Sequence, residues 1–419
     1  MTTHHDLPLG KIDHCQVCGG RNLHDVLDLG HHPPCDSLLW PRQLDEAEKT
    51  YPLRFQVCRD CSLGQIDYVV SPEVLFFPDY PYRSGITATL VEKLSKTAVS
   101  TLARFPLPEG SLAMDIGSND GTVLMAFKER GMRVLGVEAT NIAKIANESG
   151  IETLQAFFDE RLADRIVASH GQAGFITATN VFAHVAGLGG ILRGVSKLLQ
   201  DGGVFVTESH YLLDLLATTQ YDSIYHEHLR YYTLKSLIRL FDQYDFTVTD
   251  VERIDNYGGS VRVFACKGKG LPVSRAVTDL LAEEEGAGLY GTEVYDRFAE
   301  QTRKARRDLL ALVIGAKAAG KSVVGIGCPG RCSTLLNYTG LDPDLMPYIA
   351  EQPTSLKLGL FLPGKHIPIV DEKRMFKEQP DYAIMLSWHY AEPIIRKLRE
   401  KGLKSTIVVP LPDVRVFEG

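Results

Sequence analysis

Short apolar runs alternate with amphipathic segments through the middle of the chain. Four of the runs have the length and composition of buried strands: Leu112–Asp115, Arg133–Glu138, Phe175–Asn180 and Gly203–Glu208. Helix-like segments such as residues 123–130 lie between them. Strands that alternate with helices predict a parallel sheet covered on both faces, and we expect it within residues 79–268.

A second alternation follows residues 269–310, a charged stretch that predicts one long connecting helix with a solvated face. Its elements are expected as strands at Ser322–Ile326, Met346–Ala350, Tyr382–Leu386 and Lys404–Val409, and as helices near Ser333–Tyr338 and Glu392–Lys401. Residues 1–78 are rich in Cys, His and Pro and have little periodicity. The predicted fold class is therefore α/β, with a small N-terminal unit (1–78), a central domain (79–268) and a C-terminal Rossmann-like domain (269–419).

Composition narrows the classes of partner. The 419 residues are 44% hydrophobic and 23% charged, which suffices for several cores. The net charge of -7 argues against a nucleic-acid partner. Because there is no apolar run of membrane-spanning length and no secretory signal at the N-terminus, we expect no membrane partner and a cytoplasmic location. Oligomeric state cannot be predicted from these features.

Four of the eight cysteines form two close pairs, Cys15/Cys18 and Cys58/Cys61. Each C-x-x-C loop presents two thiolates, and two loops complete a tetrahedral shell around one ion. A structural zinc ion is the favoured prediction. Iron of the rubredoxin type and unrelated core cysteines are the alternatives.

The turn after the first strand has the spacing of a methyl-donor site. Asp115-Ile-Gly117-Ser-Asn-Asp-Gly121 resembles motif I of class I S-adenosylmethionine-dependent methyltransferases, and Glu138 ends the next strand, where a carboxylate can accept hydrogen bonds from ribose hydroxyls. Asn180 ends a further strand, and Phe157 or Phe158 can flank an adenine. The predicted donor-binding residues are Asp115, Gly117, Ser118, Asn119, Gly121, Glu138, Phe157 and Asn180.

Two glycine-rich turns lie near residue 320, and they differ in how well they match a phosphate-binding site. Gly315–Ser322 fits the P-loop pattern, but a helix is expected before it and a strand after it, the reverse of a phosphate-binding loop. Gly325-x-Gly327-x-x-Gly330 follows a predicted strand, with Glu351 at the end of the next one, which is the pattern of a dinucleotide or other diphosphate site. Arg331, Ser333 and Thr334 can add hydrogen-bond donors for phosphate oxygens.

Titratable groups are concentrated in Tyr225-His226-Glu227-His228. His228 is a candidate general base and Tyr225 a candidate donor to a developing enolate oxygen, whereas Glu227 can orient an imidazole or bind substrate. A metal site formed by the two histidines and Glu227 is a weaker alternative, as is a polar loop without chemistry.

The ordered set of motifs resembles the sugar-nucleotide C-methyltransferases that build C-3-branched deoxysugars. It comprises CxxC…CxxC, DIGSNDG, VFVTES, YDSIYHEH, YGGSVR, GIGCPGRCSTLLNY and LPGKHIPI, over about residues 12–412. The resemblance implies an N-terminal zinc domain, a class I methyltransferase domain and a C-terminal Rossmann-like domain, with a nucleotide-linked 4-keto-sugar bound between them. The implied cofactors are S-adenosylmethionine and zinc, the latter held by Cys15, Cys18, Cys58 and Cys61.

The resemblance also implies roles for individual residues. The catalytic set would be His228, Tyr225, Glu227, Tyr80 and Tyr82. The substrate-binding set would be Ser84, His226, Tyr257, Gly259, Ser260, Arg262, Gly327, Arg331, Ser333, Thr334, Lys357 and His366. The sequence departs from the family at Tyr257-Gly-Gly-Ser260, at Pro329–Thr334 and at Glu351–Gly359, all of which contact substrate in the family.

The expected activity is S-adenosylmethionine-dependent C-methylation of a nucleotide-linked keto-sugar, at C-3 of an NDP-4-keto-deoxyhexose. Base-catalysed enolate formation would precede methyl transfer. The alternatives are an O- or N-methyltransferase on a related nucleotide sugar, a nicotinamide-dependent dehydrogenase that uses the Gly325–Gly330 turn, and a zinc-binding interaction module.

Overall fold

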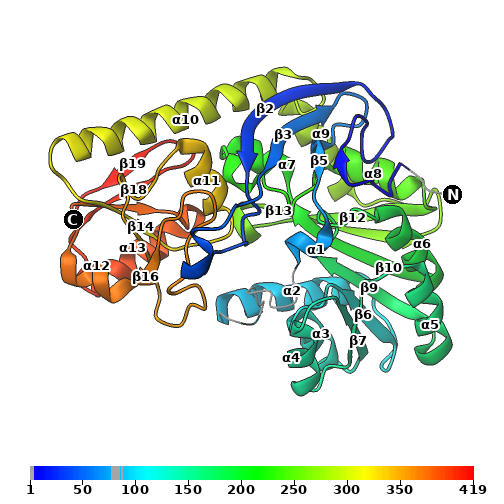
Figure 1. Ribbon diagram of the computed structural model, residues 1–419. Helices are drawn as coiled ribbons and strands as arrows, with labels where there is room; N and C mark the ends of the chain where they lie inside the picture. Colours follow the sequence, from blue (N-terminus) through cyan, green and yellow to red (C-terminus); the bar gives the residue numbers. More distant parts are fainter. Residues whose placement is uncertain (1–3, 77–84, 86–87) are drawn as a thin grey trace.

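The computed structural model describes residues 4–76, 85 and 88–419, and its strands form three main sheets (Figure 1). The largest has seven strands in the order β12-β13-β10-β9-β6-β7-β8. Their bounds are β6 Leu112–Ile116, β7 Arg133–Glu138, β8 Thr153–Gln155, β9 Ala173–Thr179, β10 Leu199–His210, β12 Phe246–Ile254 and β13 Ser260–Lys267. Only β13 runs antiparallel to its neighbours in this sheet, so the predicted parallel α/β core is confirmed.

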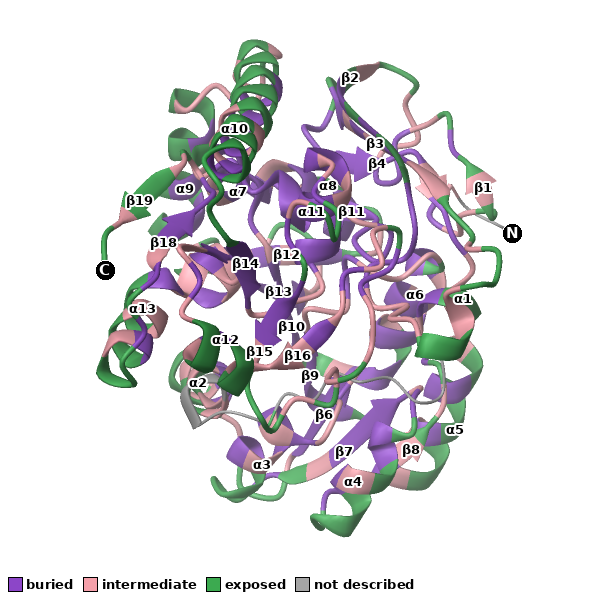
Figure 2. Ribbon diagram, turned by 60° about the vertical axis from the view of Figure 1, so that its left-hand side comes forward, coloured by how far each residue is buried: buried purple, intermediate pink, exposed green. Residues whose placement is uncertain are grey.

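Helices cover both faces of this sheet, as the alternating pattern requires. Side chains of β6 point alternately to a cluster with α2 and α3 (Ala113) and to the main core with α5 and α6 (Met114, Ile116). The helices are α2 Ala88–Arg104, α3 Thr122–Lys128, α4 Ile142–Glu148, α5 Glu160–His170, α6 Leu188–Leu198, α7 Leu212–Ala217 and α8 Leu234–Asp242. Figure 2 shows the central strands buried and the outer surfaces of the covering helices exposed.

The N-terminal unit forms a four-stranded sheet in the order β11-β4-β3-β2. Its strands are β2 Leu23–His32, β3 Tyr51–Cys58, β4 Gly64–Ile66 and β11 Arg230–Tyr231, and a separate pair joins β1 Gly10–Lys11 to β5 Tyr68–Val69. One short helix, α1 Pro72–Leu75, follows. Because β11 comes directly after the Tyr-His-Glu-His motif, pairing between Arg230 and Gln65 ties the N-terminal sheet to that loop.

The C-terminal sheet has the order β16-β15-β14-β17-β18-β19, parallel except for β19. Its elements are β14 Val323–Ile326, α11 Cys332–Thr339, β15 Ile349–Glu351, β16 Ile369–Asp371, α12 Glu372–Glu378, β17 Tyr382–Met385, α13 Ala391–Glu400, β18 Thr406–Val409 and β19 Arg415–Phe417. Each of the three sheets falls within one of the predicted domains, 1–78, 79–268 and 269–419, except that β11 of the second domain joins the N-terminal sheet. We keep these domain boundaries as a proposal.

The single helix predicted over residues 269–310 is wrong. The chain forms α9 Arg275–Gly286 and α10 Glu293–Ala318, which are separated by a turn in which Gly288 has a φ of +81°. A left-handed residue ends a helix, and glycine adopts this conformation without a steric penalty. Because α10 precedes the P-loop-like pattern and β14 follows it, the element order excludes a phosphate-binding loop there. Among the described residues, no helix is long and apolar enough to cross a membrane.

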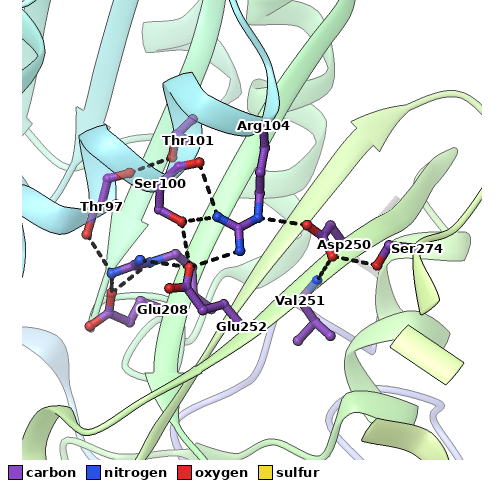
Figure 3. A network of polar contacts seen from close by, with 10 residues as sticks. Thr97, Ser100, Thr101, Arg104, Glu208, Asp250, Val251, Glu252 and Ser274 are labelled. Carbon is purple, nitrogen blue, oxygen red and sulfur yellow. Dashed lines mark hydrogen bonds and ion pairs between the residues drawn. The ribbon is translucent and has the colours of Figure 1, made fainter. Parts of the chain in front are cut away.

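A buried ion pair fixes the antiparallel end of the large sheet. Arg262 donates to Glu208 at 2.8 Å, and both side chains are 1% exposed. Thr97 accepts from the same guanidinium, so the network joins α2 to β10 and β13 (Figure 3). Asn256 also donates to Glu208. Arg262 therefore has a structural role, and its position does not support the predicted contact with substrate.

Replacing Arg262 with Met should lower the free energy of unfolding by about 3–5 kcal/mol, because Glu208 would stay buried without its counter-ion. Arg104→Met is the matched control, since Arg104 pairs with Asp250 at 2.7 Å on a partly exposed surface and should cost about 1 kcal/mol or less. Urea denaturation of both variants measures the difference. Equal losses would contradict the assigned role.

Candidate active site

A cavity of about 1240 Å³ lies where the three sheets meet. Asp6, Asp36 and Phe76 line it from the N-terminal unit, and the segment 352–357, with Arg331 and His389, lines it from the C-terminal domain. Much of the remaining wall comes from loops that follow the parallel strands of the large sheet. A cavity of this kind at the carboxyl ends of parallel strands is the usual binding site of α/β folds.

The turn between β6 and α3 forms one end of the cavity. Gly117 has a φ of +69°, and a Cβ atom there would lie 2.3 Å from Cγ2 of Val181. The N–H groups of Gly117 and Ser118 both donate to the carbonyl of Val137, at 2.7 and 3.1 Å. The turn is thus held tightly against β7, and glycine is required for its close approach to the neighbouring loop.

Asp115 lies at the base of this turn and lines the cavity. The carboxyl is buried and accepts a hydrogen bond from Oγ1 of Thr177 at 2.6 Å. Burial raises the pKa of Asp115 from 3.8 to about 7, because desolvation disfavours the carboxylate and the hydrogen bond only partly offsets this. A cationic ligand in the cavity would favour ionisation.

Glu138 ends β7 with both carboxylate oxygens held in place. Oε2 accepts from the N–H of Asn119 at 3.0 Å, and Oε1 accepts from the N–H and Oγ1 of Thr140 at 2.9 and 2.8 Å. The carboxylate faces the cavity and retains lone pairs for hydroxyl donors, as binding of a ribose requires.

The remaining donor-site predictions divide into two groups. Asn180 and Phe157 line the cavity, and Oδ1 of Asn180 and Oγ of Ser118 are buried with no hydrogen-bond partner among the described residues. Gly121 is the N-cap of α3, and a Cβ atom there would contact Ile151 and not the cavity. The glycine cradle, the held carboxylate and the two unpaired buried oxygens fit the amino acid and ribose of S-adenosylmethionine.

His228 lies at the other side of the cavity in a defined hydrogen-bonding state. Its Nδ1 lies 3.0 Å from the carbonyl of Ser223, which can only accept, so Nδ1 carries the proton. Nε2 then accepts from the hydroxyl of Tyr225 at 3.0 Å. Burial, then the neighbouring His184 and His210, lower the pKa of His228 well below 6.5, whereas burial raises the pKa of Tyr225. The pair is therefore a neutral base and a neutral hydroxyl donor.

Two cavity histidines, His184 and His210, were not among the predicted site residues. Their ring centroids lie 4.7 Å from that of His228, and burial lowers the pKa of His184 to about 4 and that of His210 to about 3. Since His210 ends β10 and His184 follows β9, their positions at strand ends were the signal that could have identified them.

The other predicted substrate residues fall into two sets. Tyr257, Arg331 and Lys357 line the cavity, as does the predicted catalytic residue Glu227, which accepts from Sγ of Cys35 at 3.3 Å. The residues that do not line it are His226, Gly259, Ser260, Arg262, Gly327, Ser333, Thr334 and His366. Tyr80, Tyr82 and Ser84 lie outside the described residues.

Most residues of the second set have partners elsewhere. His226 contacts the carbonyl of Pro52 at 3.1 Å, and His366 contacts Glu48 at 3.2 Å. Thr334 donates to the carbonyl of Ile224 at 3.0 Å. These positions connect the domains, and they do not support direct contact with a ligand in this cavity.

The four cysteines of the N-terminal unit converge. Sγ of Cys15 lies 3.5 Å from that of Cys61, the Cys18 and Cys58 sulfurs are 3.6 Å apart, and all four lie within 4.8 Å of one another. A tetrahedral zinc ion with bonds of about 2.3 Å requires sulfurs about 3.8 Å apart, so the arrangement fits. All eight cysteines are free thiols, which excludes a disulfide between these loops.

Comparisons with known proteins agree with this geometry. Three family models match successive parts of the chain: a zinc binding domain over residues 15–76, a methyltransferase domain over 90–251 and a C-methyltransferase C-terminal domain over 255–412. The chain belongs to the S-adenosylmethionine-dependent C-methyltransferases that combine these three domains. A curated relative, C-methyltransferase NovU of Streptomyces niveus, is 36% identical over 411 residues, 97% of each chain.

Two solved structures are similar to part of the chain. Magnesium protoporphyrin IX methyltransferase of Synechocystis, with bound SAH, is 11% identical with a TM-score of 0.35, covering 45% of this chain and 90% of that one. An S-adenosylmethionine-dependent methyltransferase of Clostridium acetobutylicum is 13% identical with a TM-score of 0.35, covering 42% and 92%.

Cys58→Ser should remove zinc, because three thiolates bind it much less tightly than four, and should destabilise the N-terminal unit with it. Elemental analysis should find about one zinc ion per wild-type chain. Cys266→Ser, a change of a buried cysteine on β13, should leave the zinc content unchanged. Full retention of zinc by Cys58→Ser would contradict the site.

Binding of S-adenosylmethionine should weaken as the pH falls below about 7. Asp115 is then protonated in the free protein, and the cationic ligand favours the carboxylate, so binding releases a proton and the affinity falls by up to about tenfold per pH unit. Calorimetric titrations at pH 6 and 8 measure this. In Asp115→Asn the affinity should be lower and nearly independent of pH, and an unchanged pH dependence would exclude Asp115 as its source.

Proposed function

We propose that this C-methyltransferase acts on a nucleotide-linked keto-sugar, at C-3 of an NDP-4-keto-deoxyhexose. The observation that carries the proposal is the Tyr225–His228 pair, a neutral imidazole and a phenol 3.0 Å apart in the cavity that the donor turn also lines. A C–H bond beside a ketone is acidic because the carbanion is delocalised onto oxygen. Its removal needs one base and one donor to the enolate oxygen, and this pair has that composition.

The protein's residues suit each proton movement. Nε2 of His228 would take the proton from carbon while Tyr225 turns its hydroxyl toward the enolate oxygen. Nδ1–H of His228 stays on the Ser223 carbonyl and stabilises the imidazolium that forms. S-adenosylmethionine would supply the electrophilic methyl group, which the carbanion receives as the sulfonium becomes a thioether.

The far end of the cavity supports a charged, polar substrate. Nζ of Lys357 lies 2.8 Å from the carbonyl of Cys328 and 3.4 Å from Asp36. Burial, the largest single effect, lowers the pKa of Lys357, but Asp36 and the other nearby groups together outweigh it, so the net shift is upward and the ammonium persists. Gln352, Thr354 and Ser355 line the same region. A cation with several amide and hydroxyl groups is suitable for a diphosphate and a nucleoside.

The dehydrogenase alternative has less support. Gly327 does not line the cavity, and a Cβ atom there would lie 2.6 Å from Oγ of Ser387. The cytoplasmic location and the lack of a nucleic-acid partner stay predictions from the sequence.

The protein should exchange the C-3 hydrogen of dTDP-4-keto-6-deoxyglucose for deuterium in D2O without a methyl donor, because the carbanion forms before methyl transfer. Mass spectrometry of the sugar measures the gain of one deuteron. His228→Asn should lower the rate by about 10²- to 10⁴-fold.

His170→Asn is the matched control for this experiment. His170 lies at the end of α5 against Glu152, outside the cavity, and its replacement should leave exchange unchanged. If His228→Asn exchanges as fast as the wild type, His228 is not the base.

A further inference from the structure

The segment before the Tyr-His-Glu-His motif holds the base through a backbone carbonyl. This segment is the short 3-10 turn η3, Tyr221–Ser223. The carbonyl of Ser223 accepts from Nδ1 of His228 at 3.0 Å and from the hydroxyl of Tyr231 at 2.9 Å. The orientation of this carbonyl therefore decides which nitrogen of His228 carries the proton.

The C-terminal domain holds η3 from the opposite side. Arg331 donates from Nε and Nη2 to the two oxygens of Asp222, both at 2.9 Å, and from Nη2 to Oε1 of Gln220 at 3.0 Å and to Oγ of Ser223. The contact is a forked ion pair that extends to the residue whose carbonyl holds His228. A forked guanidinium contact restricts both distance and orientation.

Two further residues of the same domain contact η3 and the residue that follows it. Nε1 of Trp388 donates to Asp222 at 2.7 Å, and its ring lies 5.2 Å from the guanidinium carbon of Arg331. Thr334 donates to the carbonyl of Ile224 at 3.0 Å, immediately after η3. Asp222 is 0% and Arg331 7% exposed. A buried ion pair often contributes little net stability, so we assign its role to the rigid geometry that it imposes on η3.

Arg331 has little hydrogen-bonding capacity left for a ligand. Nε and Nη2 are used by Asp222, Gln220 and Ser223, and Nη1 reaches the carbonyl of Tyr257 at 3.4 Å. An arginine has five N–H groups, and most of these have acceptors in the protein. The predicted role of Arg331 as a phosphate donor is therefore the weaker interpretation of its position.

We propose that Arg331 is a positioning residue for proton abstraction, which fixes the Ser223 carbonyl and so keeps Nε2 of His228 unprotonated and directed at Tyr225. The inference rests on the proposed role of His228 as the base. If Arg331 has this role, His228 can act as the base only while the C-terminal domain contacts η3. Proton abstraction then depends on the contact between these two parts of the chain.

The positive charge of Arg331 has a separate effect. The groups that face His228 are His184, His210, Tyr225, Tyr231 and Arg331. Burial and the two histidines lower the pKa of His228 most, and the Arg331 cation lowers it further. Removing the cation should raise this pKa, so the acidic limb of the exchange rate should move to higher pH. Arg331→Lys keeps the charge and should leave the limb in place.

The first experiment measures the tautomer of His228 without any ligand. Protein labelled with ¹⁵N-histidine is compared by long-range ¹H–¹⁵N NMR, and the signals absent from His228→Asn assign the residue. The wild type should show a protonated Nδ1. Arg331→Gln should lose this preference, Trp388→Phe should weaken it, and the surface variant Arg374→Gln should match the wild type. An unchanged tautomer in Arg331→Gln overturns the inference.

The second experiment uses deuterium exchange into dTDP-4-keto-6-deoxyglucose. Arg331→Lys and Arg331→Gln should both lower kcat by on the order of 100-fold through misplacement of the base, with KM changed much less. Only Arg331→Gln should move the acidic limb. A raised KM with wild-type kcat would instead make Arg331 a substrate ligand and would overturn the inference.

The two proposals fail in different ways. If His228→Asn exchanges deuterium at the wild-type rate, His228 is not the base and the proposed function fails, whatever the Arg331 variants do. If exchange is lost in His228→Asn but the Arg331 variants keep the wild-type tautomer and kcat, only the positioning role fails. Trp388→Phe keeps the test valid if Arg331→Gln does not fold, because it removes one donor to Asp222 and leaves the ion pair.

Discussion

Parallel strands end at a common edge, and the active site depends on this constraint. Asp115, Glu138, Asn180 and His210 belong to four different strand ends or the turns that follow them, yet all line one cavity. Backbone hydrogen bonds fix the register, so Asp115 lies opposite both Gly136 and Thr177. The positions of the residues in the donor turn therefore follow mainly from the strand register of the sheet.

Desolvation shifts the pKa values of the titratable groups that line this cavity. Around His228, burial lowers the pKa of three imidazoles and raises that of the Tyr225 hydroxyl, so the proposed base stays unprotonated at lower pH and the phenol stays a donor at higher pH than either would in water. The N-terminal unit and the C-terminal domain both contribute residues to the lining of the cavity, together with the large sheet.

Residue patterns allowed much of the fold and donor site to be predicted. The strand at Arg133–Glu138 has its expected bounds, and Asp115, Gly117 and Glu138 lie in the cavity as expected. These succeed because local periodicity and strand order determine them. The single helix over residues 269–310 was wrong because a left-handed glycine outweighs helix propensity on either side. The sequence context of Arg262 does not reveal its buried ion pair with Glu208, which lies directly opposite it on the neighbouring strand.

By itself, the sequence determined the three-part organisation, the four zinc-binding thiols and the donor motif. Each depends on short spacings or on periodicity, which survive without knowledge of the fold. Only the tertiary structure decided that His184 and His210 face His228, that Arg331 pairs with Asp222, and that His226, Thr334 and His366 face other partners. Such contacts join residues up to hundreds of positions apart, and the direction of a side chain depends on packing that no local pattern encodes.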